Sequence, residues 1–249
     1  MVLPHSIAIG RIPGTKAYNL NQRIARKLCK TSDTVGLWQF DGSLADSSGF
    51  GNDFTVANGA AYARYTDLYP GFTGYHNRNC VGSINNYLTQ SAFVANHARI
   101  GADLTVDFLG QFSSVNASSP ANLVSCVYTT TPVYTWMLTS CGTGCSAYHG
   151  TVISCSKNVD IAATGLALIT MARNVTTASY NIYRNGELIV SGVYSNAIPT
   201  TTTSVLKLFS WSAANQAIAY SLRIRSGCAT PAEIARDYKW CLGNYYGMD

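Results

Sequence analysis

The sequence predicts an all-β protein in which two antiparallel sheets form a sandwich. Short segments rich in β-branched and aromatic residues recur along residues 86–225 and are separated by turn formers. An Asn-Gly pair marks a hairpin between two of them, and only one segment, near the C-terminus, carries the start signals of a helix. A chain of 249 residues suits one such domain with an appendage, because all-β sandwiches commonly run to about 200–250 residues.

The first expected strands lie on either side of a polar loop within residues 36–56. An aromatic run at Leu37, Trp38 and Phe40 precedes the loop and Phe54–Val56 follows it, which is typical of two strands joined by a turn. Residues Leu104–Phe112 alternate with period two, as a strand with one apolar face does. The other expected strands are Asn86–Gln90, Leu123–Tyr128, Val133–Thr139, Thr151–Ser154, Leu166–Arg173, Ser179–Arg184, Glu187–Ser191, Val205–Trp211 and Ala217–Arg225.

Two local signals are the most specific. Asn185-Gly186 stands between two expected strands and suits the positive φ angles of a two-residue hairpin turn. Near the end of the chain, Thr230 is placed as a helix N-cap, Pro231 as the first helical residue and Glu233 at the capping-box position. A hairpin and a short C-terminal helix are therefore predicted.

Composition limits the class of protein. Hydrophobic residues make up 47% of the chain and charged residues only 12%, about half of the usual share. No run of about 18 apolar residues occurs, so we expect no membrane span. In residues 1–14 the basic residue follows a short apolar piece that Pro and Gly interrupt, which is the wrong order for a signal peptide. Classical secretion is therefore not expected.

Positive charge is concentrated in an N-terminal arm. Residues 1–32 carry a net charge of +6 and no acid, whereas residues 33–249 carry −1. Leu20, Ile24 and Leu28 follow an i, i+4, i+8 spacing, which predicts a short amphipathic helix from about residue 19. We expect the arm to dock on an acidic partner surface; the alternative is a solvated terminus. Nucleic acid is not the expected partner, because aromatic residues do not interleave with the basic ones. The expected docking residues are Arg11, Lys16, Leu20, Arg23, Ile24, Arg26, Lys27, Leu28 and Lys30.

Four pieces of the sequence occur in one order and spacing. They are Trp38-x-Phe40-Asp41-Gly42-x-Leu44-x-Asp46-Ser47-Ser48-Gly49-x-Gly51-Asn52-Asp53, Tyr87-Leu88-Thr89 followed by Leu104-Thr105-Val106-Asp107-Phe108, Tyr183-x-Asn185-Gly186, and Ser221-Leu222-Arg223-Ile224 with Pro231-Ala232-Glu233-Ile234. Together they resemble the laminin G-like, concanavalin A-like jelly-roll family over roughly residues 35–242. The resemblance implies a two-sheet antiparallel jelly-roll sandwich, with one convex and one concave sheet and a surface that binds sugars, proteins or particle neighbours. Residues 1–34 are then the arm and residues 243–249 a C-terminal tail.

Catalysis is not expected. Relatives of this fold that hydrolyse glycans need two carboxylates about 5–10 Å apart across the scissile bond. Both glutamates have structural explanations, because Glu187 lies beside the hairpin and Glu233 lies in the helix cap. Asp107 has no acidic neighbour on its face of the strand. No catalytic residue is therefore assigned.

The polar loop has two interpretations. Its carboxylate and amide groups could bind calcium through Asp41, Asp46, Asn52 and Asp53, which offer hard oxygen ligands. The same residues are ordinary turn formers whose side chains bond to their own backbone. The structural turn is the preferred interpretation, and no cofactor is expected apart from the calcium alternative.

Eight cysteines predict disulfides. Cys228 and Cys241 flank the terminal helix and invite a bridge worth about 3 kcal/mol in the chain-entropy model. Cys29 and Cys80 could pair with each other or with a neighbouring subunit. The remaining four cysteines lie within one region of thirty residues and lack the paired Cys-x-x-Cys spacing of common zinc sites, so disulfides are favoured over a zinc site. These four are Cys126, Cys141, Cys145 and Cys155.

Two functions remain open. The first is a non-enzymatic virion structural protein of a bacteriophage, a capsid or tail decoration protein present in several copies and anchored to capsid or tail subunits by its arm. The second is a carbohydrate-binding lectin or receptor-binding adhesin module, in which loop tyrosines of residues 62–75 and 245–246 stack on surface glycans.

Overall fold

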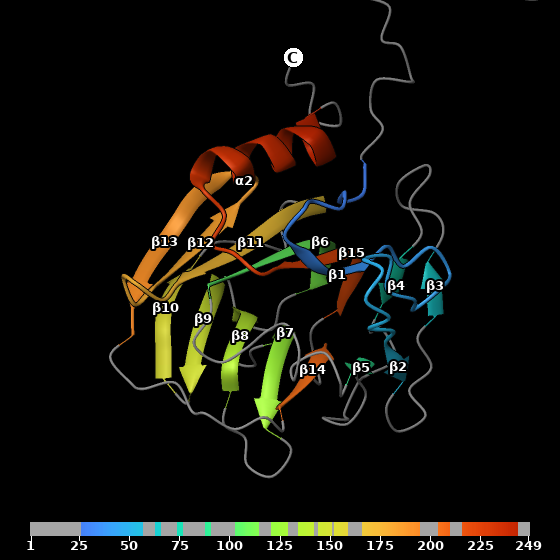
Figure 1. Ribbon diagram of the computed structural model, residues 1–249, viewed down its shortest axis with the longest axis horizontal. Coiled ribbons are helices and arrows are strands. Elements are labelled where there is room, and N and C mark those ends of the chain that lie inside the picture. Colours follow the sequence, from blue (N-terminus) through green and yellow to red (C-terminus); the bar gives the residue numbers. More distant parts are fainter. Residues whose placement is uncertain are drawn as a thin grey trace, which may run out of the picture.

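The chain folds into two antiparallel sheets that face each other, and an α-helix lies outside one of them (Figure 1). The computed structural model describes residues 26–56, 63–65, 74–76, 88–90, 103–114, 121–128, 134–141, 144–150, 152–158, 166–194, 204–209 and 216–243. The predicted all-β sandwich is confirmed. None of the helices in these residues is long and apolar enough to cross a membrane.

The first sheet carries the helix. Its strands run in the order β13 (Glu187–Val193), β12 (Ser179–Arg184), β11 (Leu166–Asn174), β6 (Leu104–Ser114), β15 (Gln216–Arg225), β4 (Gly74–His76) and β3 (Ala63–Tyr65), and β1 (Thr34–Trp38) also pairs with β15. The second sheet runs in the order β10 (Val152–Asn158), β9 (Gly144–Gly150), β8 (Tyr134–Cys141), β7 (Ala121–Tyr128), β14 (Ser204–Leu208), β5 (Leu88–Gln90) and β2 (Thr55–Val56).

The apolar core lies between the two sheets. The alternation of β6 has the predicted effect, because Leu104, Val106 and Phe108 are fully buried in this core. Trp38 enters it from β1 with its ring centre 4.6 Å from that of Phe54. The other face of β6 points to the outer side of the first sheet, where its polar residues meet the C-terminal helix.

Several strands differ from the prediction. Strand β14 ends at Leu208, since Phe209 adopts a left-handed φ of 61° and turns its ring into the core. Strand β9, with the sequence GCSAYHG, was not predicted, because Gly, Ser and Ala dilute its β propensity. The short strands β3 and β4 were not predicted either.

The Asn185-Gly186 hairpin is confirmed. Arg184 pairs with Glu187, and the two turn residues have φ angles of 51° and 82°. The turn lies against the C-terminal helix so closely that a Cβ added to Gly186 would stand 3.1 Å from Tyr238 Cδ1. Glycine is therefore required by both the backbone angle and the packing.

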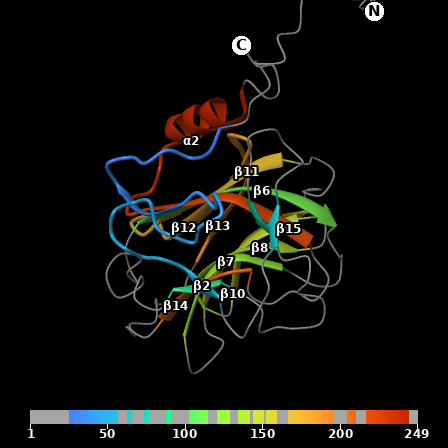
Figure 2. The ribbon, with the colours of Figure 1, turned by 90° about the vertical axis from the view of Figure 1, so that its right-hand side faces the viewer.

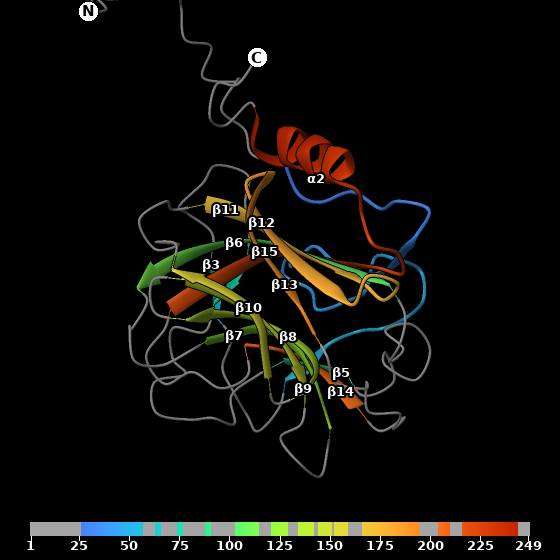
Figure 3. The ribbon, with the colours of Figure 1, turned by 90° about the vertical axis from the view of Figure 1, so that its left-hand side faces the viewer.

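The C-terminal helix α2 (Pro231–Tyr238) begins as predicted. Thr230 N donates to Glu233 Oε2 at 2.8 Å and Glu233 N donates to Thr230 Oγ1 at 3.3 Å, which completes the capping box. The helix continues into a π-helical turn, η3 (Lys239–Gly243). Views from two sides show α2 on the side of the first sheet that faces away from the second sheet (Figures 2 and 3).

The prediction of an amphipathic helix in the arm is wrong for residues 26–30, which contain no helix. Leu28 instead enters an apolar cluster on the outer side of the first sheet, and Arg26 N donates to Cys241 O at 2.8 Å. In this part of the arm, Leu28 is therefore buried against the first sheet and does not form part of the apolar face of a helix. The earlier part of the expected helix lies outside the described residues.

Candidate functional site

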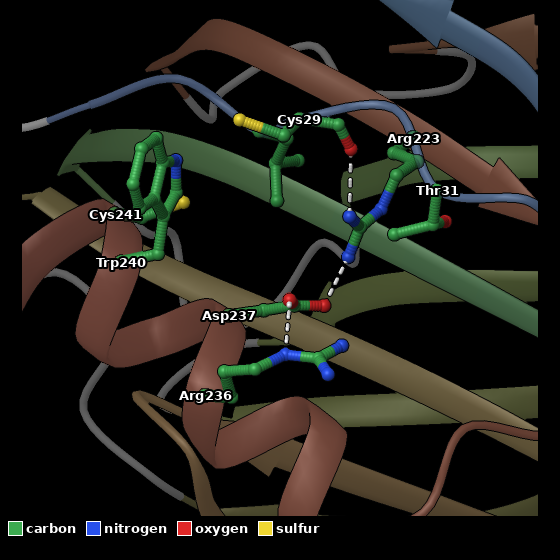
Figure 4. Close-up of a pocket in the computed structure, with 8 residues that line it drawn as sticks. Cys29, Thr31, Arg223, Arg236, Asp237, Trp240 and Cys241 are labelled. Carbon is green, nitrogen blue, oxygen red and sulfur yellow. Dashed lines mark hydrogen bonds and ion pairs between the residues drawn. The ribbon is translucent and has the colours of Figure 1, made fainter.

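A pocket opens on the outer side of the first sheet. It lies between residues 26–31, the helix α2 with η3, and strand β15, and has a volume of about 430 Å³ (Figure 4). This volume is of the size that holds a small ligand or one or two sugar rings. Its lining residues are Leu28, Cys29, Thr31, Arg223, Arg236, Asp237, Trp240 and Cys241.

Trp240 stands at this pocket as a fixed aromatic surface. Its side chain is 47% exposed, although its Nε1 donates to Lys27 O at 3.3 Å. The guanidinium of Arg26 lies 4.6 Å from the centre of the indole ring, within the range of a cation–π contact. The ring is thus held in place by residues 26 and 27 and still presents apolar surface to solvent.

Four buried charged groups lie behind and below the pocket. Asp107 on β6 accepts from Arg223 Nε at 2.9 Å and from Thr170 Oγ1 at 2.8 Å. Arg223 on β15 also pairs with Asp237 of α2, and its Nη1 donates to Cys29 O at 2.8 Å. One guanidinium therefore joins the sheet, the helix and the N-terminal segment.

Arg225 completes this charged cluster. It lies 3.2 Å from Asp107 and 3.6 Å from Asp237, and its side chain is almost completely buried. Two arginines and two aspartates thus balance each other beneath the helix. We call these four residues, Asp107, Arg223, Arg225 and Asp237, the buried charge cluster.

The environment of this cluster determines its ionisation. Burial by itself raises the pKa of Asp107, but the charges of Arg223 and Arg225 and the hydrogen bond from Thr170 outweigh it and hold that pKa below its ordinary value. Burial likewise lowers the pKa of Arg223, but Asp107 and Asp237 outweigh it and raise that pKa further. Both shifts favour the charged forms of Asp107 and Arg223 at neutral pH.

The described part of the arm contacts its own domain. Leu28 is buried and Arg26 lies over Trp240, while Lys27 Nζ bonds to Gln39 O and Asp41 Oδ1 and Lys30 Nζ bonds to Ser48 O. Burial is the largest influence on Lys27 and lowers the pKa of its amine, although Asp41 opposes this shift. These four residues thus make contacts within the chain, and their docking on an acidic partner stays a prediction. The other expected docking residues lie outside the described residues and are Arg11, Lys16, Leu20, Arg23 and Ile24.

The loop of residues 41–53 is organised by Asp46. Its carboxylate accepts from Leu37 N, Ser48 N, Ser48 Oγ and Asn52 N at 2.6–3.0 Å. Four hydrogen bonds use its acceptor sites, and the Asn52 side chain donates to Val35 O at 3.1 Å.

Two further acidic groups of this loop are also engaged. Asp53 Oδ1 accepts from Asp46 N at 2.8 Å, and Asp41 pairs with Lys27. These contacts are those of a hydrogen-bonded turn, and a calcium ion bound by these residues would have to replace some of them. Calcium binding here stays a prediction that only a measurement can test.

The predicted disulfide between Cys228 and Cys241 is not supported. Both are free thiols, as are Cys29 and Cys126. Cys228 packs near Ala229 and Ile234 at the start of α2, whereas Cys241 lies in the apolar cluster beyond its end. The eight residues of the helix rise about 12 Å, and the Cα atoms of a disulfide must lie within about 7 Å.

Because Cys29 and Cys126 are free, the expected disulfides within the chain that include them are not supported either. Cys141, Cys145 and Cys155 lie on β8, β9 and β10, and Cys80 lies outside the described residues. Among the residues that the structure describes, no three His, Cys, Asp or Glu side chains converge to hold a metal ion. In the pocket, burial raises the pKa of the Cys241 thiol, whereas Cys29 is exposed.

Sequence reasoning missed the centre of this site. The sequence pattern indicates Asp107 only as an isolated carboxylate and does not single out Arg223 or Asp237 as site residues. A signal was present, because Asp107 falls on the opposite face of β6 from the apolar residues, and Arg223 and Arg225 do so on β15. Polar residues on the second face of two neighbouring buried strands indicate a charged layer beneath a covering element.

The fold is an all-β sandwich of the lectin-like jelly-roll type. No family model matches the chain, and no curated protein matches it either. Solved structures with the same fold are binding domains of botulinum neurotoxins, and the chain spans about half of their length.

Three of these structures illustrate the likeness. The binding domain of botulinum neurotoxin DC in complex with rat synaptotagmin II has 13% identity and a TM-score of 0.62, with 83% of this chain and 51% of that chain covered. The same domain in complex with SialylT has 13% identity and a TM-score of 0.64, with the same coverage. The serotype G binding domain has 16% identity and a TM-score of 0.58, with 82% and 50% covered. At such identities the likeness establishes the fold alone.

Proposed function

We propose that the chain is a glycan-binding module without catalytic activity and that its sugar site is the pocket at Trp240. The observation that carries this proposal is an indole that is fixed by Lys27 and Arg26 yet remains 47% exposed at a pocket of about 430 Å³. Sugar rings have an apolar face that stacks on such a surface and hydroxyls that need polar partners. Arg236 and the pocket walls supply both kinds of contact.

The structural neighbours support a binding role. Binding domains of botulinum neurotoxin DC form complexes with rat synaptotagmin II and with SialylT, and cell entry of the type C toxin depends on interaction with two ganglioside molecules. The chain spans only about half of each of these binding domains, so their ligands are a guide to the kind of partner and not to the residues. A glycan or a surface receptor is accordingly the partner that we propose.

A glycan array with the full chain tests this function. We expect binding to at least one class of glycan, with loss of that binding in W240A and partial retention in W240F, which keeps an aromatic surface. The matched control is F50A, because Phe50 is 54% exposed and lies in the loop of residues 41–53, away from the pocket lining. Binding that W240A leaves unchanged would contradict the pocket as the sugar site.

The virion structural role stays a hypothesis for which the neighbours give no support. Residues 26–30 make contacts within the chain, so a deletion in the arm that spares these contacts is limited to residues 1–25. Residence in a virion, multiple copies and a phage origin belong to the same hypothesis. Removal of residues 1–25 tests it, since unchanged incorporation into particles would exclude docking by the arm.

A further inference from the structure

The charges at the pocket are unequal. Arg223 and Arg225 are balanced by Asp107 and Asp237 within the buried charge cluster. Two further arginines, Arg26 and Arg236, stand at the pocket. Arg26 lies over the indole of Trp240, and Arg236 Nε lies 3.8 Å from Asp237 Oδ1, while Glu233, one turn earlier in α2, also interacts with the charge of Arg236. Four guanidiniums therefore face three carboxylates, those of Asp107, Asp237 and Glu233, which leaves a charge of +1.

Arg236 is the arginine best placed to bring this excess positive charge to a ligand. It lies in the last turn of α2, lines the pocket, and keeps 65% of its side chain exposed (Figure 4). The nearest acid, Asp237, already pairs with Arg223 through its Oδ2. The terminal nitrogens of Arg236 consequently remain available for a bidentate contact to a planar anion.

The surroundings strengthen such a contact. Leu28 and Cys241 supply apolar walls, and the charges of the buried charge cluster beneath them balance each other. Near apolar walls the local dielectric is lower than in bulk water, so an ion pair to a ligand is stronger than one on an open surface. A neutral sugar would use the stacking surface of Trp240 and bond to Arg236 through hydroxyls, but it would form no ion pair with the guanidinium.

We infer that the pocket selects an acidic sugar, whose carboxylate or sulfate group binds Arg236 while its ring stacks on Trp240. Arg26, 4.6 Å from the centre of the indole ring, adds a second positive charge near this aromatic surface. This inference rests on the proposed glycan-binding function and specifies the class of sugar. Carboxylated and sulfated sugars share the chemistry that a guanidinium recognises, and the experiment separates them.

Titration of three matched sugars into the full chain tests the inference by comparing their affinities. The sugars are 3′-sialyllactose, 3′-sulfolactose and lactose. We expect lactose to bind at least about tenfold more weakly than one of the acidic probes, because a hydrogen bond to a charged group is lost. The preferred acidic probe identifies the anion. Its affinity is expected to fall as NaCl rises, since the contact is partly exposed.

Variants separate recognition from folding. R236Q is expected to remove the preference for acidic probes and to weaken lactose binding much less, because the amide can still bond to a hydroxyl, whereas R236K keeps the charge and retains part of the preference. K207Q is the matched control, since it removes the same charge from β14 in the second sheet. Thermal melting shows whether R236Q weakens α2 itself.

The outcomes distinguish the two proposals. If lactose and the acidic probes bind equally and W240A abolishes both, the acidic selection is refuted and the glycan-binding function stands. The selection is also refuted if R236Q and K207Q reduce acidic binding equally. If none of the probes and no arrayed glycan binds, both proposals fail.

Discussion

Asp107→Asn removes the central anion of the buried charge cluster while keeping the size of the side chain. Asp107 is completely buried and contacts Arg223, Arg225 and Thr170. The amide can still accept from Thr170, so the packing and one hydrogen bond survive. The two guanidiniums, however, are left with Asp237 as their shared carboxylate. The substitution therefore reports the cost of an unbalanced buried charge.

The expected loss in the free energy of unfolding is roughly 3–5 kcal/mol, as observed when one partner of a buried ion pair is removed. Equilibrium unfolding in urea, followed by tryptophan fluorescence, measures this loss. The slope with urea is expected to stay the same, because the variant buries the same surface. The matched control is D41N, whose parent carboxylate is 61% exposed and pairs with Lys27. Its expected cost is within about 1 kcal/mol.

The pH dependence supplies an independent check. The pKa of Asp107 is lower in the folded chain than its ordinary value of 3.8, so its contribution to stability is present above about pH 4 and is lost as pH falls through the folded pKa. The stability difference between the wild type and D107N is therefore expected to be full at pH 7 and to shrink in more acidic solution. A loss below about 1 kcal/mol at pH 7, equal to that of D41N, would refute the role assigned to the cluster.

Two further predictions concern the helix and the pocket thiols. G186A is expected to destabilise the fold by about 1–3 kcal/mol, because it forces a φ of 82° on alanine and its Cβ would meet Tyr238 at 3.1 Å. Urea unfolding measures the loss, and a change below about 0.5 kcal/mol would contradict this packing. Iodoacetamide is expected to label Cys29 in the native protein much faster than Cys241, since Cys29 is exposed and burial raises the pKa of the Cys241 thiol. Peptide mapping by mass spectrometry measures both labelling rates, and equal rates would contradict the burial of Cys241 at the bottom of the pocket.

Local patterns in the sequence were sufficient for most of the strands, the hairpin and the start of the helix. The Asn185-Gly186 turn and the Thr230 capping box each depend on residues within four positions of one another, and both formed as predicted. The apolar alternation of β6 likewise follows from residues of one strand. Such signals survive in the fold because they act over a few residues and agree with the packing.

The site was decided by tertiary structure. Arg223 and Asp107 are separated by 116 positions, and Trp240 and Lys27 by 213, so no pattern within one segment brings them together. The arm also shows that a local pattern can fail. The spacing of Leu20, Ile24 and Leu28 predicted a helix, but Leu28 is buried against the sheet in a segment without helix. The sequence by itself determined an all-β sandwich with a capped helix. Only the packing of that helix and of residues 26–31 on the sheet created a pocket, because its walls come from three distant parts of the chain.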